Sequence, residues 1–216
     1  MNIKYLYGKK NVLTPVIEDR IGLRLSDLTY YSRMENEMMR DNEMEKKFSI
    51  DRNKYNLFVA GRLVNPNEMT RDPVFTLIPR HCYCICFSSR KNDPELYKTF
   101  KADICIGFDV DLIRERLETI SHKLPGIEFQ AKDITYYHPG TPPDTFTREE
   151  LVFYKPSFFS HESEYRIAMF YPENKTGFKT DDGTIIPFIK EGEPMHMAVS
   201  HPTAGFISSC VKEVFP

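Results

Sequence analysis

The feature that most constrains the fold is the stretch HCYCICFSS, from His81 to Ser89. Its residues alternate as those of a β-strand do, with three cysteines on one face and Tyr83, Ile85 and Phe87 on the other. Both faces are apolar, so neither face suits contact with water. The stretch therefore predicts a strand inside a sheet, away from its edges.

Alternation and short apolar runs predict further strands at residues 1–8, 101–110, 127–137, 165–170 and 184–189, and in the C-terminal tail. An amphipathic helix is expected over 111–124. Residues 17–50 are rich in helix formers and predict a helical N-terminal part, with Ser26 and Asp27 as caps of a helix that continues to Phe48. Loops in the sheet-rich part, residues 80–216, are too short for crossovers. The expected fold is α+β, a single domain over 1–216 with a mostly antiparallel central sheet and flanking helices.

Composition excludes several classes of protein. The 216 residues are 41% hydrophobic, which is enough for a folded core, and 29 Lys and Arg balance 31 Asp and Glu, so no polyanionic partner is indicated. No apolar run reaches eighteen residues, and the N-terminus lacks the pattern of a signal peptide. Five cysteines without a disulfide spacing are typical of reduced thiols. We expect a cytoplasmic protein with no membrane partner.

The motifs of common catalytic and metal sites are missing from the sequence. Cys82, Cys84 and Cys86 would lie in a row about 7 Å apart on one strand face, whereas zinc sites prefer pairs of ligands around a turn. Packed thiols are the better interpretation, and no metal is expected. The glycine patterns of Rossmann and P-loop phosphate sites do not occur either.

The stretch SFFSHESEYRIAMF carries two glutamates, Glu162 and Glu164, immediately before an expected strand. On a strand they would point to the same face, where two carboxylates raise each other's pKa unless a cation lies between them. Lys155 and Arg166 are the nearby cations. The pair is interpreted either as part of a site or as the ion-paired, solvated end of a strand.

Three segments of the chain, taken together, resemble the bacterial domain-of-unknown-function 2971 family. The matching residues are Cys86, Phe87 and Ser88, then Gly107 and Asp109, then Lys155, Phe159, Glu162, Glu164, Tyr165 and Arg166. The resemblance covers roughly residues 80–215 in order. The sequence departs from the family in having no Trp and only a partial Asn-Asp-Pro stretch at Asp72 and Pro73.

The order of these motifs is also similar to that of ADP-ribosyltransferases of the Arg–Ser–Glu type. The resemblance implies that Arg20 or Arg24 would bind the pyrophosphate of NAD and that Ser88 would orient the ribose. Ser89 and Tyr165 would help to bind the cofactor. Glu164, with Glu162 beside it, would stabilise an oxocarbenium-like transition state.

Two hypotheses follow for the function. The first is an NAD-using ADP-ribosyltransferase-like or NAD-cleaving protein of a bacterial defence or toxin system, with a small-molecule nucleotide as substrate and a protein or nucleic acid as acceptor. The second is a non-catalytic binding module, in which Glu162, Glu164 and Arg166 form a structural ion-pair network.

The catalytic hypothesis requires Glu164, Ser88 and an early Arg to meet in one cleft. It also predicts that Glu164→Gln removes turnover and leaves the melting temperature almost unchanged. An oligomer is a further possibility, because Tyr30, Tyr31, Met38 and Met39 could pack a dimer as readily as a core.

Overall fold

A computed structural model describes residues 1–216 except 35–38, 123 and 144. Its main sheet has eight antiparallel strands in the order β15-β2-β7-β1-β8-β16, with β12 paired to β7 and β9 paired to β12. The strands are β1 Ile3–Gly8, β2 Leu23–Asp27, β7 Tyr83–Ser88, β8 Ile104–Asp109, β9 Glu128–Asp133, β12 Glu164–Phe170, β15 His196–Val199 and β16 Val211–Phe215. The chain is thus a mixed α+β domain with an antiparallel main sheet, as predicted.

Strand β7 is internal to the sheet, as its two apolar faces predict. On one side it pairs with β12 along its whole length, from Tyr83 to Ser88. On the other side it pairs with β2 at Cys84 and with β1 only at Ser88. Because β1 and β2 contact opposite ends of β7, no strand among the described residues pairs with Cys86 from this side.

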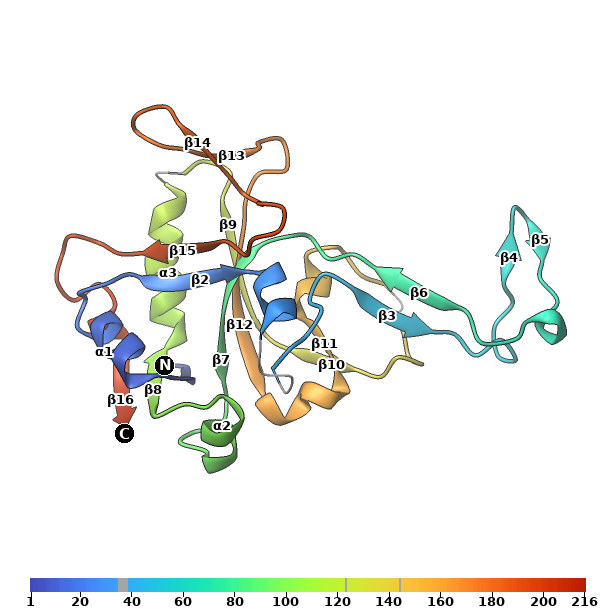
Figure 1. The fold of residues 1–216 in the computed structure, drawn as a ribbon, viewed down its shortest axis with the longest axis horizontal. Helices are drawn as coiled ribbons and strands as arrows, with labels where there is room; N and C mark the ends of the chain where they lie inside the picture. Colours follow the sequence, from blue (N-terminus) through green and yellow to red (C-terminus); the bar gives the residue numbers. More distant parts are fainter. Residues whose placement is uncertain (35–38, 123, 144) are drawn as a thin grey trace.

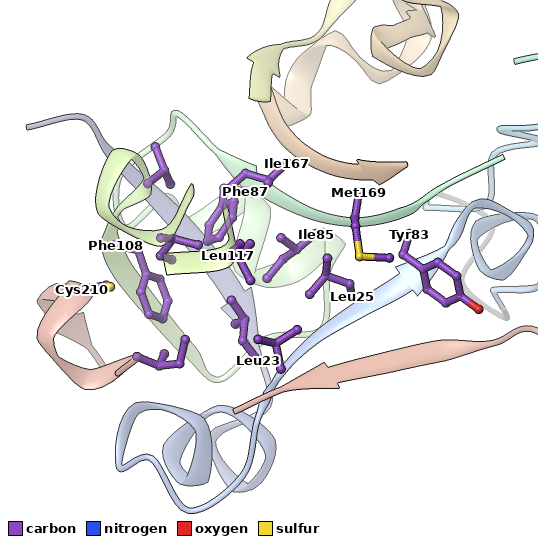
Figure 2. Close-up of a cluster of buried hydrophobic side chains, with 14 of the residues drawn as sticks. Leu23, Leu25, Tyr83, Ile85, Phe87, Phe108, Leu117, Ile167, Met169 and Cys210 are labelled. Carbon is purple, nitrogen blue, oxygen red and sulfur yellow. The ribbon is translucent and has the colours of Figure 1, made fainter. Parts of the chain in front are cut away.

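Helix α3, Val110–Ser121, lies against one face of the sheet (Figure 1). The apolar core forms between them. Figure 2 shows Ile85 and Phe87 of β7 with Ile167 of β12 and Leu117 of α3 in this cluster, all of them buried. The alternation of apolar residues along each strand therefore places one complete side-chain row under α3.

Shorter elements surround the main sheet. The α-helices besides α3 are α1 Lys10–Ile17 and α2 Pro94–Thr99, and 3₁₀ helices form at Leu28–Arg33, Pro66–Glu68, Glu150–Phe153, Ser157–Glu162 and Ser208–Cys210. Strand β10 Thr135–Tyr137 pairs in parallel with β11 Tyr154–Pro156, and β13 Gly177–Lys179 pairs with β14 Ile185–Pro187. An arm of β3 Lys46–Ser49 and β6 Val74–Leu77 extends from the sheet to a tip formed by β4 Phe58–Val59 and β5 Arg62–Leu63 (Figure 1).

The prediction of a helical N-terminal part over 17–50 is wrong. Asp27 does cap a helix, accepting hydrogen bonds from the main-chain N–H groups of Thr29 and Tyr30, but that 3₁₀ helix ends at Arg33 and Met34 is extended. Residues 23–27 and 46–49 are strands. Helix propensity is a weak preference that tertiary contacts override. Met38, in the expected helix, lies outside the described residues.

None of the helices formed by the described residues combines the length and the apolar character that crossing a bilayer requires.

Candidate functional site

The face of the sheet opposite α3 carries the polar groups of β7 and β12. Alternation points Ile167 toward α3 and turns its neighbours Arg166 and Glu164 to the opposite face, together with Cys86 and Ser88 of β7. The cross-strand pairs Glu164–Ser88 and Arg166–Cys86 lie side by side there. This face therefore brings the two motifs singled out in the sequence into contact.

The two glutamates come together around one cation. Glu162 ends a 3₁₀ helix and Ser163 adopts the left-handed conformation, with φ of 45°, before β12 begins at Glu164. The Nζ atom of Lys155 on β11 lies 2.6 Å from Oε2 of Glu162 and 3.1 Å from Oε2 of Glu164. Of the two nearby cations, Lys155 thus lies between the carboxylates. The expectation that both glutamates lie on a strand is wrong for Glu162, and a turn in place of strand alternation aligns the pair.

Arg166 continues this arrangement into the interior. Its Nε donates to Oε1 of Glu164 at 2.7 Å, its Nη1 to the carbonyl of Val152 at 2.7 Å, and its Nη2 to Oε1 of Glu43 at 2.6 Å. Lys46 on β3 holds the other oxygen of Glu43 at 2.7 Å. The result is a continuous network of buried ion pairs that links β11, β12 and the base of the arm.

The same network separates the pKa values of the two glutamates. Burial alone would raise the pKa of Glu164, but Arg166 and Lys155 lower it to about 2. Burial raises the pKa of Glu162 to about 7, because Lys155 is its single ion-pair partner among the described residues and Glu164 repels its charge. Glu164 is thus a fixed anion at neutral pH, and Glu162 is the carboxyl that can exchange a proton there.

A pocket of about 670 Å³ opens over this network, in the gap between β1 and β2. Glu162, Glu164 and Ser88 line it on one side. Arg24 lines it from β2, with its guanidinium 5.0 Å from the ring centre of Tyr30. On this side the carbonyl of Cys82 accepts a hydrogen bond from the main-chain N–H of Leu28 at 3.3 Å. Alternation therefore directs the main-chain amide and carbonyl of Cys86, four residues further on, to the same side and into the gap.

The pocket gathers four of the residues predicted for the site: Arg24, Ser88, Glu162 and Glu164. The other three lie elsewhere. Arg20 pairs with Glu18 and lines a separate surface depression. Ser89 accepts a hydrogen bond from Lys4, and Tyr165 is buried in the core under α3. Ser89 and Tyr165 follow Ser88 and Glu164 directly, so alternation turns them to the opposite face.

The hydroxyl of Ser88 is already engaged. It donates to the carbonyl of Glu162 at 2.6 Å and accepts from the main-chain N–H of Arg90 at 3.0 Å. In this arrangement it fixes the turn that carries Glu162. We therefore assign to Ser88 the positioning of Glu162 in place of the direct ribose contact that the resemblance implies.

The interpretation of the glutamates as a solvated strand end is wrong. Glu164 is 4% exposed and Arg166 is 0% exposed. Removing one member of such a buried pair leaves an uncompensated charge and costs about 3–5 kcal/mol. The burial therefore leads us to expect that Glu164→Gln lowers the melting temperature, unlike the prediction from the sequence.

Sequence reasoning missed several residues of this face. Glu43 and Lys46 form an ion pair three residues apart, but the link of Glu43 to the site has no local signal, because its other partner, Arg166, is 123 residues away along the chain. Tyr31 lines the pocket and its hydroxyl lies 3.1 Å from the Cys86 sulfur. In the sequence, Tyr31 reads only as part of the expected N-terminal helix.

Comparisons with known proteins assign no family to the chain. No protein-family model matches the sequence, and neither a curated protein nor a solved structure matches it. The site itself therefore carries the argument for function.

Proposed function

We propose that the protein binds NAD in the pocket over Ser88 and cleaves its nicotinamide glycosidic bond, as an ADP-ribosyltransferase-like or NAD-cleaving enzyme. The observation that carries the proposal is the convergence of Arg24, Ser88, Glu162 and Glu164 on one pocket from three distant parts of the chain. The volume of about 670 Å³ falls within the range usual for cofactor and substrate sites.

The pocket offers a partner for each part of NAD. Arg24 is an exposed cation at its wall and suits the pyrophosphate. Tyr30 and Tyr31 offer aromatic rings against which a flat base can pack. The main-chain amide of Cys86 can donate a hydrogen bond to the carbonyl oxygen of a carboxamide, and its main-chain carbonyl can accept one from the carboxamide NH₂. The carboxylates of the floor favour the positively charged nicotinamide ring.

The two carboxylates would have different roles in the reaction. The bond between C1′ of the ribose and the nicotinamide nitrogen breaks, and its electron pair neutralises the ring. Glu164, held ionised by Arg166 and Lys155, stabilises the positive charge that develops on the ribosyl carbon. A water or an acceptor hydroxyl then attacks C1′, and Glu162 takes its proton.

The first experiment measures nicotinamide release from NAD by the purified protein, with mass spectrometry to detect ADP-ribose on added protein or nucleic acid. The wild type should release nicotinamide, and Glu162→Gln should lower kcat by about 10²–10⁴-fold. Arg24→Met should raise KM about tenfold to a hundredfold by removing a charged hydrogen-bond partner of the pyrophosphate.

Arg20→Met is the matched control, since Arg20 is an exposed arginine that lines a different depression. Its kinetics should equal those of the wild type. A protein that neither binds NAD nor releases nicotinamide contradicts the proposal. An effect of Arg20→Met with none of Arg24→Met would place the nucleotide in the other depression.

A second candidate is a non-catalytic binding module of a bacterial defence or toxin system. The observation in its favour is that Glu164 and Arg166 use their charged groups in buried ion pairs. In that case the pocket would bind a ligand without turnover, and Glu162→Gln would alter binding or stability alone. Tight NAD binding without nicotinamide release would favour this module.

A further inference from the structure

Among the described residues, the buried charged network beneath the pocket contains one more carboxyl group than it has cations. The buried carboxylates of this face are Asp41, Glu43, Glu162 and Glu164, and the buried cations are Lys46, Lys155 and Arg166. Each of these residues is less than one tenth exposed. An unbalanced buried charge is strongly unfavourable, so the set tends to take up a proton or a cation.

The ion pairs show which buried carboxyl group lacks a matching cation and also lines the pocket. Glu43 contacts both Arg166 and Lys46, and Glu164 contacts both Arg166 and Lys155. Within the part of the chain that the structure describes, the Glu162 carboxylate pairs with Lys155 alone, through one oxygen, and shares that cation with Glu164. Asp41 forms no ion pair within the described residues and does not line the pocket. Of the two under-neutralised carboxyls, Glu162 is thus the one that a ligand can reach.

The surroundings of Glu162 come from four segments. Lys155 faces it from β11, Glu164 from β12, Glu43 from the segment before β3, and the phenol of Tyr136 from β10. One cation thus faces two carboxylates besides Glu162 itself. Water cannot compensate the excess, because Glu162 is only 5% exposed.

We propose that Glu162 holds a proton at neutral pH in the ligand-free protein and releases it when a cationic group of a ligand enters the pocket. The ligand cation then supplies the missing positive charge, and the ionised carboxylate becomes its counter-ion. The raised pKa of Glu162, about 7, agrees with this charge count.

The inference rests on the proposed function, since it takes the pocket over Ser88 as the ligand site. It adds a recognition rule: the pocket selects ligands whose inner end is a flat cation, such as a pyridinium or an amidinium. Binding of the cation also prepares the site for reaction, because it converts Glu162 into the ionised form that can accept a proton.

Isothermal titration calorimetry with benzamidine, a flat cation, and benzamide, its neutral analogue, tests the inference without NAD. Titrations in buffers of different ionisation enthalpy give the number of protons released. Benzamidine should release a substantial fraction of one proton at pH 6.5, and benzamide none. The affinity for benzamidine should rise about tenfold per pH unit below the pKa of Glu162 and level off above it.

Two variants test whether Glu162 is the group that releases the proton. Glu162→Gln should abolish the proton release and the pH dependence, whereas Glu115→Gln, at an exposed position of α3, should keep both. Equal affinity for benzamidine and benzamide, binding without proton release, or no benzamidine binding at millimolar concentration would each overturn the inference. These outcomes are independent of NAD turnover, so a catalytically inactive protein that binds benzamidine with proton release would contradict only the proposed function.

Discussion

Arg166 and Ile167 are neighbours on β12 and are both 0% exposed, yet they enter opposite faces of the sheet. Ile167 packs into the apolar core under α3, among side chains that need only volume and contact (Figure 2). Arg166 needs two carboxylates and a carbonyl at hydrogen-bond distance. The first face tolerates repacking, whereas the second depends on each partner separately.

This difference bears on function as well as on stability. Burying ion pairs is often no better for stability than apolar packing of the same volume. The charged face therefore needs a reason beyond folding, and the pocket above it supplies one. Its network holds Glu164 ionised and leaves Glu162 under-neutralised in the only part of the network that opens to the pocket within the described residues.

The largest effect expected is that of Arg166→Met. The substitution leaves Glu43 and Glu164 without their shared cation and should lower the free energy of unfolding by about 3–5 kcal/mol, measured by urea denaturation. Lys132→Met is the matched control, because Lys132 lies directly opposite on β9 and is exposed. It should cost less than about 1 kcal/mol.

A double variant sharpens this test. Glu164→Gln removes one of the two carboxylates that lose a cation in Arg166→Met. The two substitutions together should therefore cost less than the sum of their separate effects, by about 0.5–3 kcal/mol. Additive costs would mean that the two side chains are not energetically coupled, which contradicts the network.

The next effect is that of Ile167→Ala on the apolar face. It should lower the free energy of unfolding by about 3 kcal/mol through lost burial and the cavity left behind. That cost should not change with pH or with salt, since no charge contacts the deleted atoms. A strong pH dependence would show that the two faces do not behave as separate regions.

The apolar face could be predicted from the sequence. The two apolar faces of β7 predict its place inside the sheet, and the spacing of apolar residues predicts α3; both depend on patterns within a dozen residues. The prediction of an N-terminal helix is wrong because the contacts that decide this segment are distant in the sequence. Glu43 and Lys46 look like the solvated charges of a helix, but both are buried: Glu43 pairs with Arg166, more than a hundred residues away, and Lys46 pairs with Glu43.

The candidate site was predictable to a similar degree. Glu162, Glu164 and Lys155 were grouped correctly because they are close in sequence. Alternation could have rejected Ser89 and Tyr165, since neither can share a face with the residue before it. The choice of Arg24 over Arg20 depends on the pairing of β2 with β7, which the sequence does not reveal.

The smallest expected effect is a change of stability with pH that comes from the charged face of the sheet and not from the apolar one. The pKa of Glu162 is about 7 in the folded protein against an ordinary value of 4.5, so the folded state keeps a proton that the unfolded state releases. This favours folding at low pH, and the contribution is lost as pH rises from about 4.5 through 7, at no more than about 1.4 kcal/mol per pH unit. Urea denaturation across this range should show the decline in the wild type. In Glu162→Gln, whose amide resembles the protonated acid, this part of the decline should be absent, while Ile167→Ala should keep it. Parallel curves for wild type and Glu162→Gln would contradict the assignment of the proton to Glu162.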